Sequence, residues 1–396
     1  MHRALFLAML VPCASAAPTF FRDVLPILQN RCQECHRPGE IAPMPLETYE
    51  QARPWAKAIR EQVRTRRMPP WPADPCCGHF SNDRSLTPLE IETLANWAEA
   101  GAARGDSGDA PPKRSWPDGW NLPSHDLELS MPKPFPIPAS GAVEYQYFPI
   151  PTGFREDRWV QAVEVRPANP SVVHHIVAYI REPGSTWTHG PTKNDILAVY
   201  APGTTPDAWP DGMAKLIPAG ADVVLEIHYT PTGKPASDQT KVALRFAPKK
   251  PEKRVLTLQL NNDHFRIPAG DRHFEITAWG SIPNDALLLS LFPHMHLRGK
   301  SFTYALIDDR DVRTLLNIPK YDFYWQLSYR FETPIPLKKG MRLQCWAVYD
   351  NSPNNPRNPD PSADVTYGQQ SWEEMMVGFF DVAVDADLGK PEFFVR

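Results

Sequence analysis

The sequence predicts a chain of several domains, in which a small all-α domain is followed by two all-β antiparallel sandwich domains. Its 396 residues exceed what one typical core holds. Its 45 prolines are more than twice the average share of about 5%, which favours short strands and turns over long helices. Apolar residues recur at helical spacing near the N-terminus and in short strand-like runs afterwards. Apolar content is ordinary, so we expect packed cores.

Residues 1–16 are expected to be a secretory signal peptide. A basic residue and a short apolar stretch lead to a small-residue cleavage site that ends at Ala16. The stretch is too short to span a bilayer, which argues against a membrane anchor. Cys13 raises the alternative of a lipoprotein signal, but Pro12 stands where such signals have a small residue. We therefore expect an exported protein, either periplasmic or extracellular.

Residues 17–108 are predicted to form the all-α domain. The segments FFRDVLPILQ and EQARPWAKAIREQV have amphipathic helical spacing. The start of a third helix is better defined, because Thr87 is a natural N-cap and Glu90 completes a capping box around Pro88. Gly101 is expected to end this helix.

The remaining chain is predicted to be a linker followed by strands. Residues 109–140 are dense in proline and turn residues, which indicates a linker. Runs such as SVVHHIVAYI and ALLLSLFPHMHL are short, rich in β-branched or aromatic residues and separated by turn residues. The basic segment APKKPEKR divides them into predicted β-sandwich domains at 141–248 and 249–396.

Charge and hydropathy limit the expected partners. The formal net charge is −4 without long runs of either sign, so nucleic acid and anionic membranes are not expected. After the signal, no stretch approaches the roughly 20 apolar residues of a transmembrane helix, so no transmembrane segment is expected.

Cys32, Cys35 and His36 form a C-x-x-C-H run, which is typical of c-type haem attachment. Two thiols a turn apart add to the haem vinyl groups, and the adjoining histidine reaches the iron. A thioredoxin-like dithiol would need a βαβ setting that the sequence does not indicate. A zinc site would need a second cysteine or histidine pair, which Cys76, Cys77 and His79 supply only awkwardly. We therefore predict one covalent haem c.

The helical pattern around this run resembles a small class I cytochrome c domain. That family has a methionine as the sixth iron ligand, usually before a proline in the loop ahead of the last helix. Met68, in RRMPPW, matches this position. Met44 is the alternative, although it lies only eight residues after His36. A thioether opposite an imidazole raises the haem potential, which suits an electron carrier.

The other cysteines do not suggest a disulfide framework. Adjacent cysteines such as Cys76 and Cys77 rarely bridge each other, because the resulting ring is strained. Cys345 then has no obvious partner. We have no functional account of these three residues.

Histidines of the β region come in three groups: His174 with His175, His228 alone, and His294 with His296. Residues two apart face the same side of a strand, so the last pair can hold one metal ion. The adjacent pair would face opposite sides and can share a metal only at a strand end or a bulge. A lone strand histidine such as His228 is usually a half-buried side chain without a metal.

The order H-H, H-Y, H-x-H and E-E-M resembles the copper-dependent, ascorbate-type monooxygenases, namely peptidylglycine alpha-hydroxylating monooxygenase and dopamine beta-monooxygenase. The resemblance runs from about residue 130 to about residue 385. It is supported by LRGK after the H-x-H, by LKKGMRLQCWAVYDNS and by TYGQQSWEEMMVGF. It implies two antiparallel β-sandwiches of jelly-roll type that carry one copper each.

The resemblance also implies a ligand set for each copper. The first copper, which stores and passes an electron in that family, would be held by His174, His175 and His228. The second, where oxygen binds and the substrate C–H bond is broken, would be held by His294, His296 and Met375. Imidazoles suit both oxidation states of copper and a thioether favours Cu(I). Met376 is the alternative thioether.

The substrate pocket departs from the family pattern. The peptide-processing relative binds its substrate carboxylate with an arginine two residues before the H-x-H and a tyrosine four residues after the methionine. Phe292 and Phe379 stand at those positions here. We therefore expect a neutral or apolar small substrate rather than a glycine-extended peptide.

These observations predict an exported copper monooxygenase that hydroxylates a C–H bond with O2. An external donor, either an ascorbate-like reductant or a redox protein, would supply electrons through the haem. One alternative is an exported electron-transfer or copper-handling protein without oxygenase activity. Another is a haem-anchored binding module on a β-sandwich scaffold.

Overall fold

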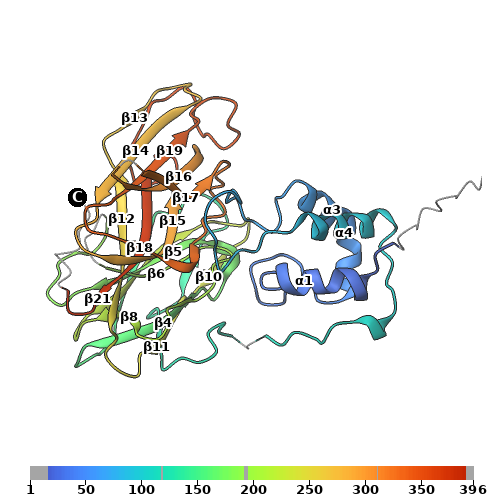
Figure 1. The fold of residues 1–396 in the computed structure, drawn as a ribbon, viewed down its shortest axis with the longest axis horizontal. Coiled ribbons are helices and arrows are strands. Elements are labelled where there is room, and N and C mark those ends of the chain that lie inside the picture. Colours follow the sequence, from blue (N-terminus) through green and yellow to red (C-terminus); the bar gives the residue numbers. More distant parts are fainter. Residues whose placement is uncertain (1–16, 117–118, 191–194, 310, 389–396) are drawn as a thin grey trace, which may run out of the picture. The chain divides into compact units, whose positions relative to one another are not determined.

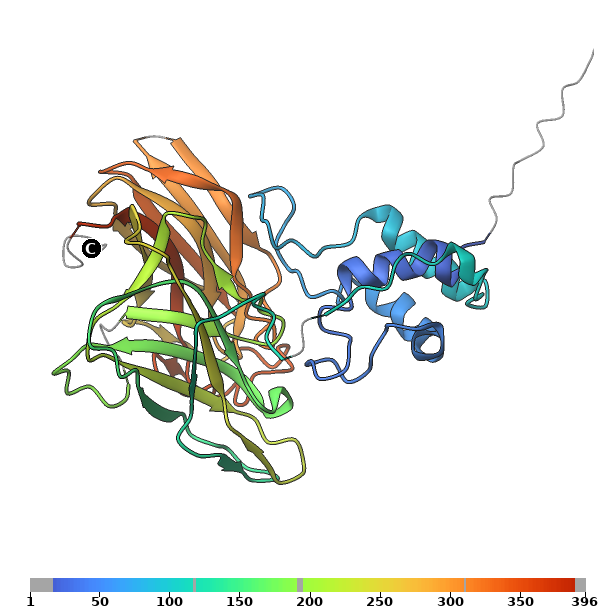
Figure 2. The ribbon, with the colours of Figure 1, turned by 90° about the horizontal axis from the view of Figure 1, so that it is seen from below.

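The computed structural model describes residues 17–116, 119–190, 195–309 and 311–388. The predicted signal peptide, with Cys13, lies outside these residues. The chain divides into two units (Figures 1 and 2). The first comprises the chain up to Pro70 together with Arg84–Arg114, and the second comprises Trp71–Asp83 together with the chain from Ser115 onward.

The first unit contains short helices around a small core. Its described helical segments are Phe20–Val24 (a π turn), α1 (Leu25–Arg31), α2 (Tyr49–Ala52), Arg53–Trp55 (a 3-10 turn), α3 (Ala56–Arg64), α4 (Pro88–Glu99) and Ser107–Asp109 (a 3-10 turn). The predicted start of α4 is confirmed, because the N–H of Glu90 donates to Thr87 Oγ1 and the N–H of Thr87 donates to the Glu90 carboxylate. Trp97 and Leu94 of α4 are fully buried in the core with Phe20.

The predicted fold class was wrong. The chain as described is mostly β-sheet, and its first unit is not a small all-α cytochrome c-like domain. Its longest helix has 12 residues, and long irregular segments separate the helices. The physical reason is that prolines and turn residues interrupt the helical spacing, as in HRPGEIAPMPLE after α1 and MPPWPADPCCG after α3.

The second unit is built from β-sheets, and one large sheet runs through most of it (Figure 1). In spatial order this nine-stranded sheet contains β1 (Leu127–Ser130), β11 (Lys241–Phe246), β4 (Arg158–Arg166), β8 (Met213–Ile217), β12 (Lys253–Asn262), β21 (Met376–Asp385), β15 (Ala286–His294) and β18 (Tyr329–Leu337), with β7 (Asp207–Ala208) beside β4. Its neighbours pair antiparallel except β8 and β12, which are parallel.

Two four-stranded sheets complete the layers. One contains β3 (Gln146–Pro151), β9 (Asp222–Tyr229), β5 (Val173–Arg181) and β6 (Asp195–Tyr200). The other contains β14 (Phe274–Ser281), β19 (Arg342–Tyr349), β16 (Gly299–Asp308) and β17 (Asp311–Ile318). Two small ribbons pair β2 (Phe135–Ile137) with β10 (Ala236–Asp238), and β13 (Arg266–Ile267) with β20 (Val365–Thr366). The 3-10 turn Pro170–Val172 leads into β5.

The large sheet carries two hydrophobic cores on opposite faces. On β21, Val382 is buried in one core and the next residue, Ala383, in the other. Leu288 and Leu289 of β15 divide in the same way. Side chains alternate along a strand, so a strand covered on both faces is apolar along most of its length, as β15 is. The predicted domain boundaries, including that between residues 248 and 249, stay predictions.

Segment 71–83 belongs to the second unit, although it lies between α3 and α4 in sequence. Phe80 forms an antiparallel β-bridge with Phe331 of β18, and its ring lies 5.2 Å from that of Phe331. Trp71 packs on Tyr329 with 4.9 Å between ring centroids. The segment therefore extends the edge of β18.

The same segment contains a disulfide that the sequence analysis did not expect. Cys76 and Cys77 bridge each other, so the expectation from ring strain was wrong. The positive φ of +79° at Gly78 turns the chain directly after the bridge. Glycine is the residue type that adopts this conformation without strain, which accounts for the CCG sequence here.

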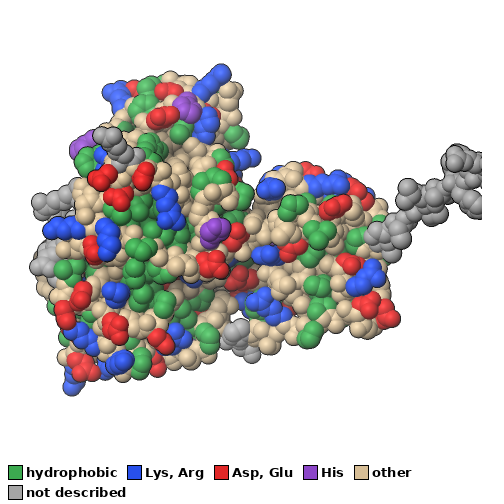
Figure 3. Space-filling model, in the orientation of Figure 1, with side chains coloured by type: hydrophobic (Ala, Val, Ile, Leu, Met, Phe, Trp, Pro, Cys, Tyr) green, Lys and Arg blue, Asp and Glu red, His purple; other side chains and the backbone are tan. Residues whose placement is uncertain are grey.

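The surface of the second unit bears interspersed basic and acidic side chains on the face drawn in Figure 3. In the described part of the chain, no helix has the length and apolar character that crossing a membrane requires.

Candidate metal centre

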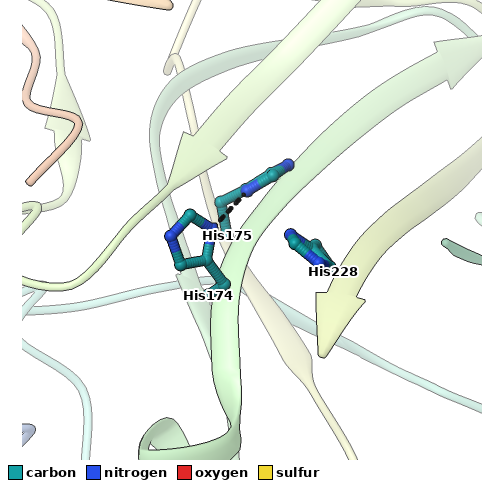
Figure 4. Close-up of side chains that lie close together, drawn as sticks. All are labelled: His174, His175 and His228. Carbon is teal, nitrogen blue, oxygen red and sulfur yellow. Dashed lines mark hydrogen bonds between the residues drawn. The ribbon is translucent and has the colours of Figure 1, made fainter. Parts of the chain in front are cut away.

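Three of the predicted ligands come together on two neighbouring strands. His174 and His175 lie at the start of β5, and His228 lies at the end of β9 (Figure 4). The β5–β9 register pairs Val173 with Tyr229 and His175 with His228, which leaves His174 as an extra residue in a β-bulge. The bulge turns both adjacent histidines to one side, as a shared metal requires.

The geometry of these three residues suits one metal ion. Their candidate ligand nitrogens all lie within 4.8 Å of one another. The Nδ1 atoms of His174 and His175 are 3.0 Å apart. Two nitrogen ligands of one ion are at most about 4 Å apart, because a metal–nitrogen bond is about 2 Å long. Small side-chain rotations would therefore bring all three nitrogens within bonding distance of one ion.

Burial keeps these imidazoles neutral. It lowers the pKa of His174 to about 3, that of His228 to about 4, and that of His175 further below the ordinary value. The neighbouring histidines add to this lowering. A neutral imidazole has a lone pair for a metal, so burial prepares these residues as ligands.

Two nitrogens of this group have no hydrogen-bond partner. His174 Nε2 and His228 Nδ1 are buried and unpaired among the described residues. An unpaired buried polar atom costs about 1–3 kcal/mol, so native structures rarely leave one without a ligand. This observation shows that the residues fit a metal ion.

Aromatic rings enclose the three histidines. Tyr145 stacks on His228 with 4.8 Å between ring centroids, and Phe323 stacks on His174 at 4.4 Å. Tyr145 precedes β3, and Phe323 lies in the loop between β17 and β18. The rings restrict the orientation of the imidazoles.

His294 and His296 form the second group. His294 ends β15, His296 follows two residues later, and their ring centroids are 5.2 Å apart. Their Nδ1 atoms face oxygen acceptors, which are Gln326 Oε1 at 2.6 Å and the Glu373 carbonyl at 3.3 Å. Each Nδ1 therefore carries the proton, and each Nε2 keeps its lone pair.

The environment of the second group matches the first. Burial lowers the pKa of both His294 and His296. His296 Nε2 is buried without a hydrogen-bond partner in the described chain. It is thus a third unpaired imidazole nitrogen that fits a metal ion.

The structure separates the two candidate methionines. Met376 is fully buried in the core between the nine-stranded sheet and the β14–β17 sheet, so its side chain is a packing residue. Met375 is half-buried and lies two residues before Val377, which pairs with His294 across the β15–β21 ladder. Cross-strand partners share a face, so Val377 lies on the face of His294, whereas Met375 and His296 lie just outside the two strands.

The two predicted ligand groups lie in contact. The rings of His175 and His294 are only 5.9 Å apart. The resemblance implied one copper in each of two sandwiches, whereas the structure joins the five histidines in one cluster, in which His228 is partly exposed and the other four are buried.

The predicted apolar side chains of the pocket lie beside this cluster. The rings of Phe292 and Phe379 are 6.1 Å apart, and Phe379 lies 6.3 Å from the ring of His294. Phe292 is two residues before His294 on β15, hence on the same face of the sheet. Neither position therefore offers a polar or cationic side chain that could bind a substrate carboxylate.

The C-x-x-C-H run lies in the first unit. The N–H of His36 donates to the Cys32 carbonyl, so Cys32, Cys35 and His36 follow one helical turn. His36 Nδ1 lies 3.1 Å from the Met44 carbonyl oxygen, and therefore its Nε2 has the lone pair that haem iron needs. Burial lowers the pKa of His36 and keeps the ring neutral.

The two candidate sixth ligands differ in their surroundings. Met44 packs against the core of the first unit. Met68 is half-buried in the turn after α3, where its N–H donates to the Gln62 carbonyl at 3.3 Å.

The remaining described cysteine is structural. Cys345 is fully buried in the core between the nine-stranded sheet and the β14–β17 sheet. A Cβ atom added to Gly378 would lie 2.6 Å from its sulfur, so Gly378 leaves room for Cys345.

Sequence reasoning missed several residues of the site. Gln326 and Phe323 belong to a loop that carries no motif. Tyr145 lies in a run identified only as a strand. Glu374 was noted only as part of the E-E-M string, although its carboxylate accepts hydrogen bonds from the backbone of the H-x-H loop.

Comparison with known proteins gives no functional parallel. No protein family and no curated protein sequence matches the chain. The major capsid protein P2 from bacteriophage PM2 is a structural match with 10% identity, a TM-score of 0.29, and coverage of 66% of this chain and 99% of that chain. The structure of infectious bursal disease virus (Gt strain) matches with 11% identity and a TM-score of 0.19, over 70% of this chain and 77% of that chain. The structure of allantoicase matches with 9% identity and a TM-score of 0.15, over 52% of this chain and 78% of that chain. Likenesses of this degree carry no argument about function.

Proposed function

We propose that this protein is an exported monooxygenase that uses two copper ions and one covalent haem c to hydroxylate a C–H bond of a small neutral or apolar substrate. The observation that carries the proposal is the cluster of five imidazoles, four of them buried and that of His228 partly buried, three of which have an unpaired buried nitrogen. Such a cluster leaves polar atoms unsatisfied unless a metal ion is bound.

Copper fits the donor set better than the common alternatives do. His174, His175 and His228 offer only imidazole nitrogens, and His294 and His296 add Met375 as a thioether donor. Imidazole suits copper in both oxidation states, and a thioether favours Cu(I) over zinc. Bound copper would supply one-electron redox chemistry and an oxygen-binding site.

The chain's own residues prepare this chemistry. Gln326 and the Glu373 carbonyl hold the protons of His294 and His296 on Nδ1 and thereby direct each Nε2 to the metal. Phe292 and Phe379 line the same face with apolar rings, which favours an apolar C–H substrate and excludes water. In the overall reaction one oxygen atom enters the C–H bond, and two electrons and two protons convert the other to water.

The first unit would deliver those electrons. Cys32 and Cys35 would bind the haem covalently, His36 would ligate the iron through Nε2, and Met68 would supply a second iron ligand. The haem would supply one-electron transfer from an external donor, either an ascorbate-like reductant or a redox protein. Covalent haem attachment accords with the expected export of the protein.

Metal and haem analysis of the purified, haem-matured protein tests the proposal. We expect two coppers and one haem per chain. We also expect oxygen consumption coupled to hydroxylation when a panel of neutral, aromatic and carboxylate-bearing C–H substrates is offered. Zinc or no metal in the histidine cluster would contradict the metal assignment, and a preference for peptide carboxylates would contradict the substrate class.

A second candidate is an exported electron-transfer or copper-handling protein. The contact between His175 and His294 favours it, because five imidazoles in one largely buried cluster can bind copper without admitting a substrate. Copper binding with no oxygen consumption for any substrate would support this alternative.

A further inference from the structure

Residues of three sequence strings that are not themselves predicted ligands meet in one buried polar network next to the H-x-H. The strings are LRGK, which follows the H-x-H, YDNS after β19, and E-E-M before β21. Glu374 is 0% exposed and Arg298 is 2% exposed. Two buried ionisable residues beside a candidate metal centre need a physical reason, since burying either of them in its charged form is costly.

Glu374 binds the backbone of the H-x-H loop. Its Oε2 accepts from the N–H of His296 at 2.9 Å, and its Oε1 accepts from the N–H of Arg298 at 2.6 Å. The β15–β21 ladder ends at the pair of His294 and Val377. Beyond that pair, the Glu374 carboxylate takes the place of strand hydrogen bonds between the two segments.

Arg298 fixes the far end of the loop. Its Nε donates to Asn351 Oδ1 at 2.8 Å, and its Nη1 donates to the Trp372 carbonyl at 2.9 Å. Asn351 in turn donates to two backbone carbonyls, each at 2.9 Å. The network therefore ties the H-x-H loop to the segment that carries Met375.

We infer that Glu374 is a positioning residue that sets His296 against Met375 at the second copper, an inference that rests on the proposed function. His296 and Met375 come from segments that the strand ladder does not join. A thioether and an imidazole can bind one ion only if their separation is held within fractions of an ångström. A buried carboxylate that accepts two backbone N–H groups provides this rigidity.

The variant Glu374→Gln tests the inference, because an amide of the same size turns an NH2 group toward one of the two N–H donors. Glu164→Gln is the matched control, since Glu164 is also buried and accepts from the N–H groups of Asn121 and Leu122 at 2.7 and 2.9 Å. Amide exchange at His296 and Arg298 is measured in the metal-free protein. Copper content and the copper–sulfur signal in X-ray absorption are measured in the Cu(I) protein.

We expect Glu374→Gln to speed exchange at both amides by on the order of tenfold and to remove the copper–sulfur signal. Glu164→Gln should change neither. Exchange rates and a copper–sulfur signal like those of the wild type in Glu374→Gln would overturn the inference. If Glu374→Gln fails to fold, Glu374→Asp has a carboxylate too short to reach both N–H groups and is judged by the same readouts. If the wild type binds no copper, the proposed function fails, and amide exchange alone then decides whether Glu374 holds the loop.

Discussion

The buried histidines make the stability of the metal-free protein depend on pH. Burial lowers the pKa of His228 to about 4, from 6.5 for a solvated imidazole. Between these values the unfolded chain binds a proton that the folded protein does not bind. The free energy of unfolding should therefore fall as the pH drops from about 6.5 to about 4.

Urea unfolding of the metal-free protein across this pH range measures the effect. His228→Gln, which cannot be protonated, should remove up to roughly 3 kcal/mol of the pH dependence. His264→Gln is the control, because the His264 side chain is 95% exposed. Equal slopes in the wild type and His228→Gln would contradict the prediction.

Met375 and Met376 should differ sharply on substitution. Met375→Leu removes the thioether from the second ligand group and should lower hydroxylation by orders of magnitude while the haem still accepts electrons. Met376→Leu is a volume-conserving change in a core and should cost less than about 1.5 kcal/mol of stability with activity retained. Activity assays and thermal unfolding check both variants. Full activity in Met375→Leu would exclude Met375 as a ligand and would favour the electron-transfer alternative.

The ligand types of the candidate site could be predicted from sequence, but their arrangement could not. Strand periodicity places His294 and His296 on one face, and it requires a strand end or a bulge at His174 and His175, of which the structure contains the bulge. The contact of His175 with His294 depends on how two sheets pack, which no local spacing encodes. Gln326 could not be found because a hydrogen-bond acceptor in a loop has no periodic signature.

At the scale of single elements, the packing of segment 71–83 against β18 depends on one glycine, Gly78. A Cβ at Gly78 would lie 2.6 Å from the Leu315 carbonyl oxygen and 2.5 Å from the Phe80 ring, at a φ of +79°. Gly78→Ala should therefore release the segment from β18 and speed its hydrogen exchange.

Gly141→Ala is the matched control for this prediction. Gly141 also has a positive φ, of +96°, but no atom lies within 4 Å of the added Cβ. It should show only the backbone strain of about 1 kcal/mol and leave exchange in segment 71–83 unchanged. Exchange-coupled mass spectrometry of that segment separates the variants. Unchanged exchange in Gly78→Ala would show that the packing around Phe80 tolerates the methyl group.

Elements were predictable where one local interaction determines them. The start of α4 follows from the capping box of Thr87 and Glu90, which acts within four residues. The prediction of an all-α domain was wrong because amphipathic spacing shows only which residues a helix would bury. The length of each helix depends on the prolines and turn residues that separate the amphipathic segments. The Cys76–Cys77 bridge was missed because adjacent cysteines rarely bridge each other, and no local pattern marks the exception.

At the scale of the whole molecule, the nine-stranded sheet should couple its two cores. Val382 lies in one core, and its neighbour Ala383 lies in the other. Val382→Ala should cost roughly 2 kcal/mol. This loss of stability should appear in both cores, because β21 belongs to the sheet that separates them.

Hydrogen exchange of β5 and β19 in mild denaturant measures this coupling, since each strand covers a different core. We expect exchange in both strands to accelerate by the same factor in Val382→Ala. Acceleration confined to β19 would show that the two halves of the second unit unfold separately. The parallel pairing of β8 with β12 that completes the sheet was not predictable, because pairing between strands so distant in sequence has no local signal.

The course of the chain through segment 71–83 constrains how this protein can be cut into fragments. The first unit is interrupted in sequence, since the chain leaves it after Pro70 and returns at Arg84. A gene truncated after Arg114 would therefore encode the C-x-x-C-H run together with the 13-residue segment 71–83, deprived of its partner strand β18. Trp71 and Phe80 would then be exposed apolar rings beside an open strand edge, a combination that promotes aggregation. Soluble expression of the first unit should therefore require that segment 71–83 be replaced by a short polar turn.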